Sequence, residues 1–345
     1  MKTVYSEKHA LHAPLKEIYC GEILDCAEKP ARAVSVYETM KAEKLGEILL
    51  PKPYAIEKIL RVHDVGYVDF LKNAFTDWKA KGLNANVFGT NFNIQHQKSL
   101  SPRPPQTVEG KAGYYLADTS VSITDGTWEA VENNVHVALT ALDIVLGGDS
   151  SAFALCRPPG HHASRAAAAG YSFLNNAAIA AQSFIDEKGG KVAILDVDYH
   201  HGNGTQEIFY DRADVLYCSL HADPAMDFPY FSGYADEKGA GAGTGFNHNY
   251  PLPLGTRGDT YLPALGDAVK KIAAYKPDLL LVSLGVDTYK DDPISYFKLD
   301  KPDYFRTGEV IAQLNVPCLF ILEGGYAIDE IGNNVSSVLK GFLNL

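Results

Sequence analysis

Short apolar runs alternate with longer helical patterns from about residue 150 to the end of the chain. Continuous apolar runs of this length are typical of strands that are buried on both faces. Their alternation with helices predicts an α/β fold in which helices cover both sides of a parallel sheet. The five runs are SAFALCRP (151–158), KVAILDVD (191–198), DVLYCSLH (214–221), DLLLVSLGVD (278–287) and VPCLFILEGG (316–325).

The first 150 residues are less regular, and their pattern predicts a strand at 2–6 and helices at 31–44 and 54–60. Residues 88–106, FGTNFNIQHQKSLSPRPPQ, indicate a long polar loop with three prolines. Loops of this length are uncommon and often functional. The sequence has no internal repeat and no low-complexity linker, so we expect a single domain over residues 1–345. Further helices are expected at 175–189 and 264–275.

Composition is that of an ordinary soluble globular protein, with 46% hydrophobic and 21% charged residues in a chain of 345. The net charge of −11 argues against nucleic acid or an anionic membrane as the main partner, because both attract basic surfaces. The same charge suits a small cationic substrate, although many enzymes are acidic for solubility alone.

The cysteines and the N-terminus indicate a cytoplasmic protein. Five cysteines without a Cys-x-x-Cys pair argue against a disulfide framework or a cysteine zinc site. The first residues lack the continuous apolar stretch of a signal peptide. The sequence also contains no apolar run long enough to cross a bilayer, so we expect no membrane partner.

Residues able to do chemistry follow each of the five apolar runs. In open parallel sheets, ligands bind outside the carboxyl ends of the strands. Five neighbouring strand ends would therefore form one pocket lined by His, Asp and Tyr side chains. The residues concerned are His161 and His162, then Asp196, Asp198 and His200 with His201, then Ser219 to His221, then Asp287, and finally Glu323 to Tyr326.

The segment ILDVDYHHGNG favours metal binding. Side chains at alternate positions of an extended chain share a face, so Asp196, Asp198 and His200 point the same way. Two buried carboxylates on one face repel each other unless a cation lies between them. Separate capping or ion-pair roles would require cationic partners, and the segment has no Lys or Arg after Lys191. A metal site is the better interpretation.

A third strong ligand is expected from Asp287, which follows the apolar run LLLVSLGV. By itself this signal is weak, because a lone Asp at a strand end is more often a helix cap. Two Asp and one His would leave a tetrahedral zinc with an open position, which is the catalytic pattern. Oxygen and nitrogen ligands leave Fe²⁺ and Co²⁺ open as alternatives.

Two further elements suit proton transfer and oxyanion stabilisation. His161 and His162 follow a Pro-Pro-Gly turn that presents them, and the pKa of His suits acid and base tasks near neutrality. Tyr326 follows two glycines, and a Tyr hydroxyl beside a metal can donate to a developing oxyanion. Taken singly, the histidines could be a chance pair and Tyr326 an ordinary packing tyrosine. Their placement after predicted strands favours the functional interpretation.

Six motifs in this order resemble the histone deacetylase superfamily: CRPPGHH, GYSFLNNAAIAA, ILDVDYHHGNGTQ, SLGVDT, DPISYFKL and LEGGY. Within it, the chain resembles the bacterial acetylpolyamine amidohydrolases most. The resemblance extends from the N-terminal strand to about residue 340, and the combination of motifs is specific although each alone is not. It implies an arginase-like, three-layer α/β fold with an eight-stranded parallel sheet.

The resemblance also implies two metal sites. It implies zinc bound by Asp198, His200 and Asp287, which agrees with the interpretation from the residues. It implies a second, structural site for a monovalent cation, for which we expect potassium. The residues of that second site are Asp196, Asp198, His200, Ser219 and Leu220.

Catalytic roles follow from the same resemblance. His162 resembles the general base and acid of the family, and His161 its electrostatic partner. Asp196 matches the acidic partner of His161. Asn203 stands where some relatives carry Asp as partner of the second histidine, and a neutral partner would make His162 less basic. Tyr326 matches the oxyanion-binding tyrosine.

The substrate tunnel is implied by resemblance alone. Tyr171 and Phe228 resemble its aromatic walls, and Glu17 matches an acidic residue at its mouth, with Glu109 in a similar segment. Residues 75–110 resemble the long insertion by which polyamine amidohydrolases form homodimers and narrow the tunnel mouth. Carboxylates at that mouth would attract the charged tail of a polyamine.

We therefore predict a zinc-dependent amidohydrolase that removes acetyl groups from acetylated polyamines or other small acetylated amines. A protein acetyl-lysine deacetylase with a wider tunnel mouth is one alternative. An arginase-type ureohydrolase would need a second metal and carboxylates that HHGNG lacks. A non-catalytic acetyl-amine binder is disfavoured by the intact ligands. Ser120, where a relative carries Glu, and the alanine run 166–169 leave the fine substrate preference open.

Overall fold

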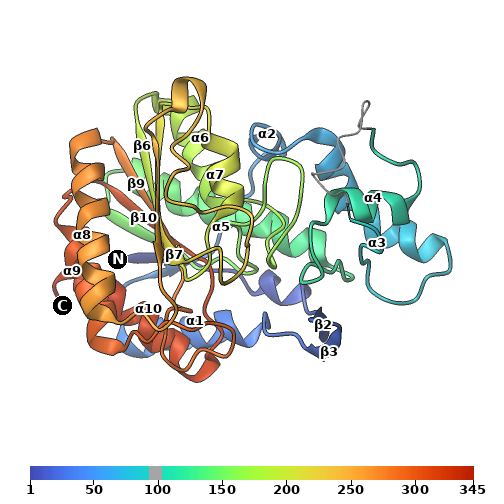
Figure 1. Ribbon diagram of the computed structural model, residues 1–345, viewed down its shortest axis with the longest axis horizontal. Coiled ribbons are helices and arrows are strands. Elements are labelled where there is room, and N and C mark those ends of the chain that lie inside the picture. The colour runs from blue at the N-terminus through green and yellow to red at the C-terminus, as the bar shows by residue number, and fades with distance from the viewer. Residues whose placement is uncertain (93–102) are drawn as a thin grey trace.

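Helices cover both faces of a parallel sheet in the computed structural model (Figure 1), which describes residues 1–92 and 103–345. The sheet has eight strands in the order β4-β1-β5-β10-β9-β6-β7-β8, and every pair in it is parallel. The predicted fold is confirmed. The strands are β1 Lys2–Val4, β4 Ile48–Leu49, β5 Ser151–Ala154, β6 Val192–Asp196, β7 Val215–Ala222, β8 Asn247–Leu252, β9 Leu279–Leu284 and β10 Cys318–Leu322.

The five predicted apolar runs form five neighbouring strands, β5, β10, β9, β6 and β7, and each of these is buried along its whole length. Burial on both faces explains why these runs are continuously apolar rather than alternating. The outer strand β8 was not predicted. Its sequence, NHNYPL, is partly exposed and lacks a continuous apolar run.

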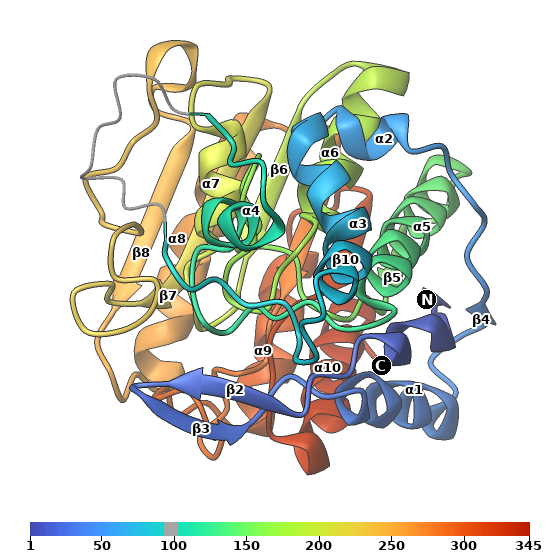
Figure 2. The same cartoon turned by 90° about the vertical axis from the view of Figure 1, so that its right-hand side faces the viewer.

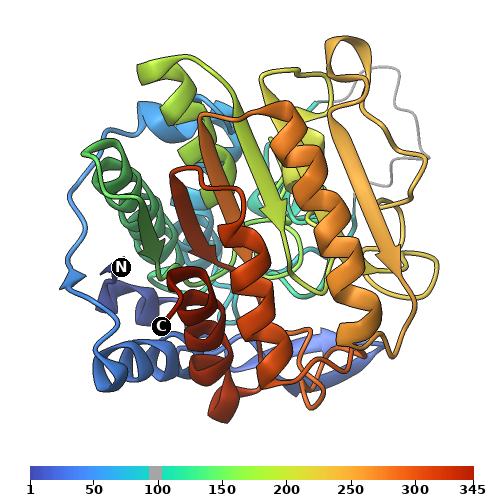
Figure 3. The ribbon, with the colours of Figure 1, turned by 90° about the vertical axis from the view of Figure 1, so that its left-hand side faces the viewer.

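The two faces of the sheet are covered by different helices. Figure 2 shows α3 to α7 in front of one face, and Figure 3 shows α8, α9 and α10, in orange to dark red, over the other. Helix α10 packs against α1 and α9. The helices are α1 Ala31–Glu43, α2 Glu57–Leu60, α3 Val65–Ala80, α4 Val108–Tyr115, α5 Thr127–Leu146, α6 Asn176–Lys188, α7 Asn203–Phe209, α8 Gly258–Tyr275, α9 Lys301–Ala312 and α10 Ile328–Leu343.

A small antiparallel hairpin, β2 (Lys16–Tyr19) and β3 (Glu22–Asp25), lies beside the carboxyl ends of the strands (Figures 2 and 3). Its turn residues Cys20 and Gly21 both have positive φ angles, 51° and 83°, as tight hairpin turns require. The hairpin was not predicted. It brings an N-terminal segment to the edge where ligands are expected.

The predicted polar loop 88–106 has neither helix nor strand in the part that the structure describes, and residues 93–102 lie outside it. The loop separates α3 from α4, so the predicted insertion 75–110 begins inside one helix and ends inside the next. Among the described helices, none combines the length and the apolar character needed to cross a membrane.

Candidate metal centre and active site

Sheet pairing brings the predicted residues together at one edge. Strands β6 and β9 are neighbours, and Asp196 at the end of β6 lies opposite Ser283. Asp198 and Asp287 follow the ends of these two strands in the loops. Two carboxylates that are far apart in sequence therefore meet at the centre of the sheet, beyond the carboxyl ends of its strands.

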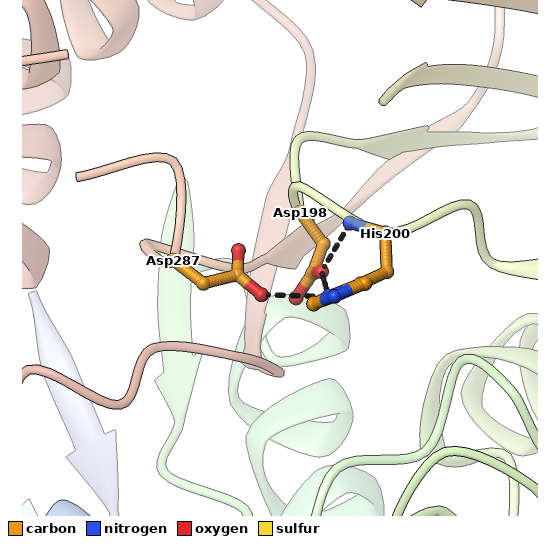
Figure 4. A group of neighbouring side chains, drawn as sticks. All are labelled: Asp198, His200 and Asp287. Carbon is orange, nitrogen blue, oxygen red and sulfur yellow. Dashed lines mark hydrogen bonds and ion pairs between the residues drawn. The ribbon is translucent and has the colours of Figure 1, made fainter. Parts of the chain in front are cut away.

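Asp198, His200 and Asp287 point toward one another (Figure 4), and one possible ligand atom of each lies within 4.8 Å of the others. The Nδ1 atom of His200 lies 3.0 Å from Oδ2 of Asp287 and 3.4 Å from Oδ1 of Asp198. Both aspartates are fully buried, and His200 is only 8% exposed. The structure thus places all three predicted ligands in one buried group.

Backbone groups hold the two carboxylates in place. The Gly324 N–H donates to Oδ2 of Asp198 at 2.7 Å, and the Tyr199 N–H donates to Oδ1 of Asp287 at 2.8 Å. A Cβ atom on Gly285 or Gly324 would overlap the Asp198 carboxylate. Glycine at both positions lets the backbone approach the carboxylates closely. Such outer-shell bonds orient metal ligands.

The charges in this group favour a bound cation. Burial and the negative charge of Asp198 raise the pKa of Asp287 to about 7. Burial opposes a charge on His200, but its hydrogen bonds to Asp198 and Asp287 raise its pKa to about 10. A positive charge is therefore favoured beside the two carboxylates, and either a protonated His200 or a bound cation would supply it. Two oxygen ligands and one nitrogen ligand fit zinc with an open position, and they also fit Fe²⁺ or Co²⁺.

The two consecutive histidines have different partners. Nδ1 of His161 lies 3.0 Å from Oδ2 of Asp196, which also accepts the hydroxyl of Tyr217 at 2.9 Å. Nδ1 of His162 lies 2.7 Å from Oδ1 of Asn203. Since both partner oxygens accept, each ring carries a proton on Nδ1, and a ring that is neutral then has Nε2 free to accept a proton. Both histidines are buried, and their ring centroids are 4.0 Å apart.

The surroundings drive the pKa values of the two histidines apart. Burial opposes a charge on His161, but Asp198 and Asp196 raise its pKa to about 10. Burial lowers the pKa of His162 well below its usual value, and the neighbouring His161 and His200 lower it further. A cationic imidazole beside a neutral one is an arrangement in which the neutral ring can act as a base.

Tyr326 is buried and held from two sides. Its N–H donates to Oδ2 of Asp292 at 2.7 Å, and the guanidinium carbon of Arg32 lies 4.6 Å from the centre of its ring. Arg32 also donates to the backbone carbonyls of Glu323 and Gly325. The turn before Tyr326 is therefore fixed by a buried cation.

The two predicted aromatic walls both contact candidate catalytic residues. The ring of Phe228 packs edge-on against His162 at 5.0 Å, and the ring of Tyr171 lies 5.6 Å from that of Tyr326. The Tyr171 hydroxyl donates to Glu17 at 2.6 Å. Glu17 is only 8% exposed, and burial raises its pKa. Its carboxylate is thus a partner of the tunnel wall rather than a free surface charge.

Glu109 and Ser120 have partners of their own. Both carboxylate oxygens of Glu109, on α4, lie 2.7 Å from Nζ of Lys81 in an exposed ion pair. The Ser120 hydroxyl donates to Asp118, whose other oxygen accepts the N–H of Gly170. Gly170 precedes Tyr171, so Ser120 supports the segment of this predicted tunnel residue indirectly.

The residues predicted for a monovalent cation also gather at this edge. Ser219 lies opposite Asp196 in the pairing of β6 with β7, and its hydroxyl lies 2.7 Å from Nδ1 of His221. The carboxylate and hydroxyl oxygens among these residues are ligands that suit a hard cation. All five predicted residues are buried, namely Asp196, Asp198, His200, Ser219 and Leu220.

Several residues of the site were given no role by sequence reasoning. Glu28 and Arg157 are fully buried and form an ionic network with Arg32. Asp292 accepts the backbone N–H of Tyr326, and Glu323, which the sequence placed at a strand end without a role, accepts that of Gly160. Arg157 and Glu323 lie inside the motifs CRPPGHH and LEGGY, where a buried charge next to apolar residues was the available signal. Asp292 is the first residue of the motif DPISYFKL, but it lies in a polar segment, so burial of its charge could not be expected from its neighbours.

Comparison with known proteins agrees with this geometry. The family model described as the histone deacetylase domain matches residues 26–342. Acetylpolyamine amidohydrolase 1 of Pseudomonas aeruginosa is 52% identical over 99% of both chains, and the acetylpolyamine amidohydrolase of Mycoplana ramosa is 46% identical over 99% of both. A crystal structure of an acetylpolyamine aminohydrolase from Burkholderia pseudomallei matches with a TM-score of 0.93 and 37% identity, over 99% of this chain and 98% of the other.

Proposed function

This chain belongs to the histone deacetylase family, and on that premise we propose that it hydrolyses acetylated polyamines to the free amine and acetate. The observation that carries the proposal is the convergence of one metal-ligand group, two polarised histidines and a buried tyrosine at one sheet edge. The names of the relatives that are 46–52% identical support a polyamine substrate.

Asp198, His200 and Asp287 would hold the catalytic ion, for which we propose zinc. When bound, a divalent ion supplies Lewis-acid polarisation of the amide carbonyl and makes water more acidic. The chain itself supplies fixed carboxylates, because backbone N–H groups orient both of them. Ferrous iron and cobalt fit the same three ligands.

His162 is the proposed general base and acid. Its Nδ1 proton is held by Asn203, so Nε2 accepts the proton of the attacking water and later delivers it to the leaving nitrogen. His161 is held in its cationic form by Asp196 and stabilises negative charge that develops during the reaction. The two histidines have different roles because the partner of His161 is a carboxylate and the partner of His162 is an amide.

Tyr326 is the proposed oxyanion donor. Its hydroxyl would donate to the oxygen of the tetrahedral intermediate, which a fixed donor stabilises better than water does. Asp292 and Arg32 hold the residue in place, so little reorganisation is needed during the reaction. Phe228 and Tyr171 would flank the acyl chain and exclude water.

Acidic residues are proposed to attract the substrate at the tunnel mouth. Glu17 lies behind Tyr171, and its negative charge would draw an ammonium group toward the tunnel. The charge of Glu109 is already balanced by Lys81, so we assign Glu109 a smaller share. We also propose a structural potassium ion at the predicted cation site, a homodimer formed through residues 75–110, a single domain, a cytoplasmic location and no nucleic-acid partner.

The test is a side-by-side assay of the purified protein on acetylated putrescine, cadaverine and spermidine and on an acetyl-lysine peptide. We expect the small acetylated amines to be preferred, and we expect chelation to abolish activity until zinc is restored. A preference for the peptide would favour the protein deacetylase alternative. Binding of acetylated amines without acetate release by the zinc-loaded protein would favour the non-catalytic alternative.

A further inference from the structure

Glu323 follows the last residue of β10 and is fully buried. Its Oε2 atom accepts two consecutive backbone N–H groups, from Gly160 at 2.6 Å and from His161 at 3.1 Å. Its Oε1 atom accepts the hydroxyl of Ser283 at 3.2 Å. Both oxygens are therefore committed, and the side chain reaches from one strand end to the backbone of the histidine pair.

Packing alone does not explain a carboxylate at this position. Burial opposes a charge on Glu323 and the charges of Asp196 and Asp198 add to that cost, although His161 and the Gly160 N–H favour the ionised form. A neutral acceptor could pair the same two N–H groups without burying a charge. The Glu323 side chain is, however, long enough to reach the backbone of the histidine pair, and this contact points to its function.

The same turn also contacts the other parts of the site. The Gly324 N–H donates to the metal-ligand candidate Asp198, and Tyr326 follows two residues later. The side chain of Glu323 adds the histidine pair to these contacts. One short turn thus fixes the relative positions of the carboxylate, the tyrosine and the histidines.

We propose that Glu323 is a positioning residue, whose two hydrogen bonds to the Pro-Pro-Gly-His-His backbone set the distance from His162 to the scissile amide. The proposal rests on the function proposed above. Glu323 itself touches no reacting atom. A displacement of about 1 Å in a group that transfers a proton can reduce the rate by roughly 10²-fold.

Two conservative variants distinguish the effect of side-chain length from the effect of charge. Glu323→Gln keeps the length, so its carbonyl oxygen can still accept both N–H groups while its NH₂ donates to Ser283. Glu323→Asp keeps the charge but is one methylene shorter and cannot span the same gap. A positioning role predicts that the Gln variant is the more active of the two, whereas an electrostatic role predicts the reverse.

The experiment measures kcat, KM, zinc content and backbone hydrogen exchange for both variants. We expect Glu323→Gln to keep kcat within about 5-fold of the wild type, since a single net hydrogen bond is worth about 1 kcal/mol. We expect Glu323→Asp to lose roughly 10- to 100-fold in kcat with KM nearly unchanged. In the Asp variant, the peptide covering residues 157–163 should exchange faster while zinc content stays constant.

A matched control is Asp278→Asn, because the Asp278 carboxylate accepts the Lys191 N–H just before the strands β9 and β6 begin, at the opposite edge of the sheet. It should leave both kcat and exchange at residues 157–163 unchanged. Equal kcat in all variants, a more active Asp variant, loss of zinc, or a slow Asp variant with unchanged exchange would each overturn the proposal. A wild type without deacetylase activity would refute the proposed function instead, and the exchange measurement would still report on these hydrogen bonds.

Discussion

Replacing Glu28 by Gln is expected to destabilise the protein strongly, because Glu28 is a buried charge. Its carboxylate is fully buried between two buried arginines, 2.8 Å from Nη1 of Arg32 and 2.7 Å from both Nε and Nη2 of Arg157. Removing the only negative charge of this triad leaves two uncompensated guanidinium groups. Breaking a buried ion pair in this way costs about 3–5 kcal/mol.

The lower end of that range applies here. Arg157 keeps hydrogen bonds to the carbonyls of His9 and His12, and Arg32 keeps its own two carbonyl partners, so neither cation is left bare. We therefore expect a loss of about 3 kcal/mol in the free energy of unfolding, measured by urea denaturation with an unchanged m value.

Asp186→Asn is the matched control, because Arg61 binds the Asp186 carboxylate through two hydrogen bonds of 2.9 Å at the surface. Exposed pairs contribute only about 0–1 kcal/mol. If Glu28→Gln destabilises the protein no more than this control does, the buried triad does not hold the fold together as inferred.

The stability lost in Glu28→Gln should decrease as the pH falls. Burial opposes ionisation of Glu28, but Arg157 and Arg32 hold its pKa below the usual value of 4.5. A carboxyl group with a lowered folded pKa contributes stability that is complete above its unfolded pKa and is lost as the pH falls. The difference in the free energy of unfolding between wild type and Glu28→Gln should therefore be constant near neutrality and shrink below pH 4.5.

Three further predictions address the site. Asp287→Ala should lose both bound metal and activity, and wild-type metal content by elemental analysis would contradict the ligand assignment. His162→Ala should keep the metal but lose roughly 10²-fold or more in rate, and a larger loss in His161→Ala would reverse the two roles. Glu17→Gln should raise KM for acetylated diamines without changing kcat or the rate on neutral amides. The paired Glu109 offers its control, because Glu109→Gln should leave the same KM nearly unchanged.

The centre of the sheet could be predicted from the sequence because strands that are buried on both faces are continuous apolar runs. The run KVAILDVD is continuously apolar until it reaches the edge of the sheet, where its carboxylates appear. The alternate spacing of Asp196, Asp198 and His200 then indicates a shared direction. Joining Asp287 to them required only the rule that parallel strands place their carboxyl ends together.

The supporting residues could not be predicted in the same way. Glu28 and Arg157 are 129 residues apart in sequence, and no periodic pattern connects them. The hairpin that carries Glu17 is largely exposed and has no clear alternation of apolar and polar residues. Its position beside Tyr171 is a consequence of tertiary packing, so the contact appears only once the chain is folded.

The distribution of buried charge explains how one edge of an apolar sheet can carry so many acidic groups. Asp196 is balanced by His161, and Asp198 and Asp287 together favour a positive charge beside them. Around Arg32 the balance is reversed, because two arginines, Arg32 and Arg157, pair with the single carboxylate of Glu28. Arg32 lies 4.6 Å from the ring centre of Tyr326, so this excess positive charge is next to the proposed oxyanion donor, where it favours negative charge that develops on the substrate oxygen.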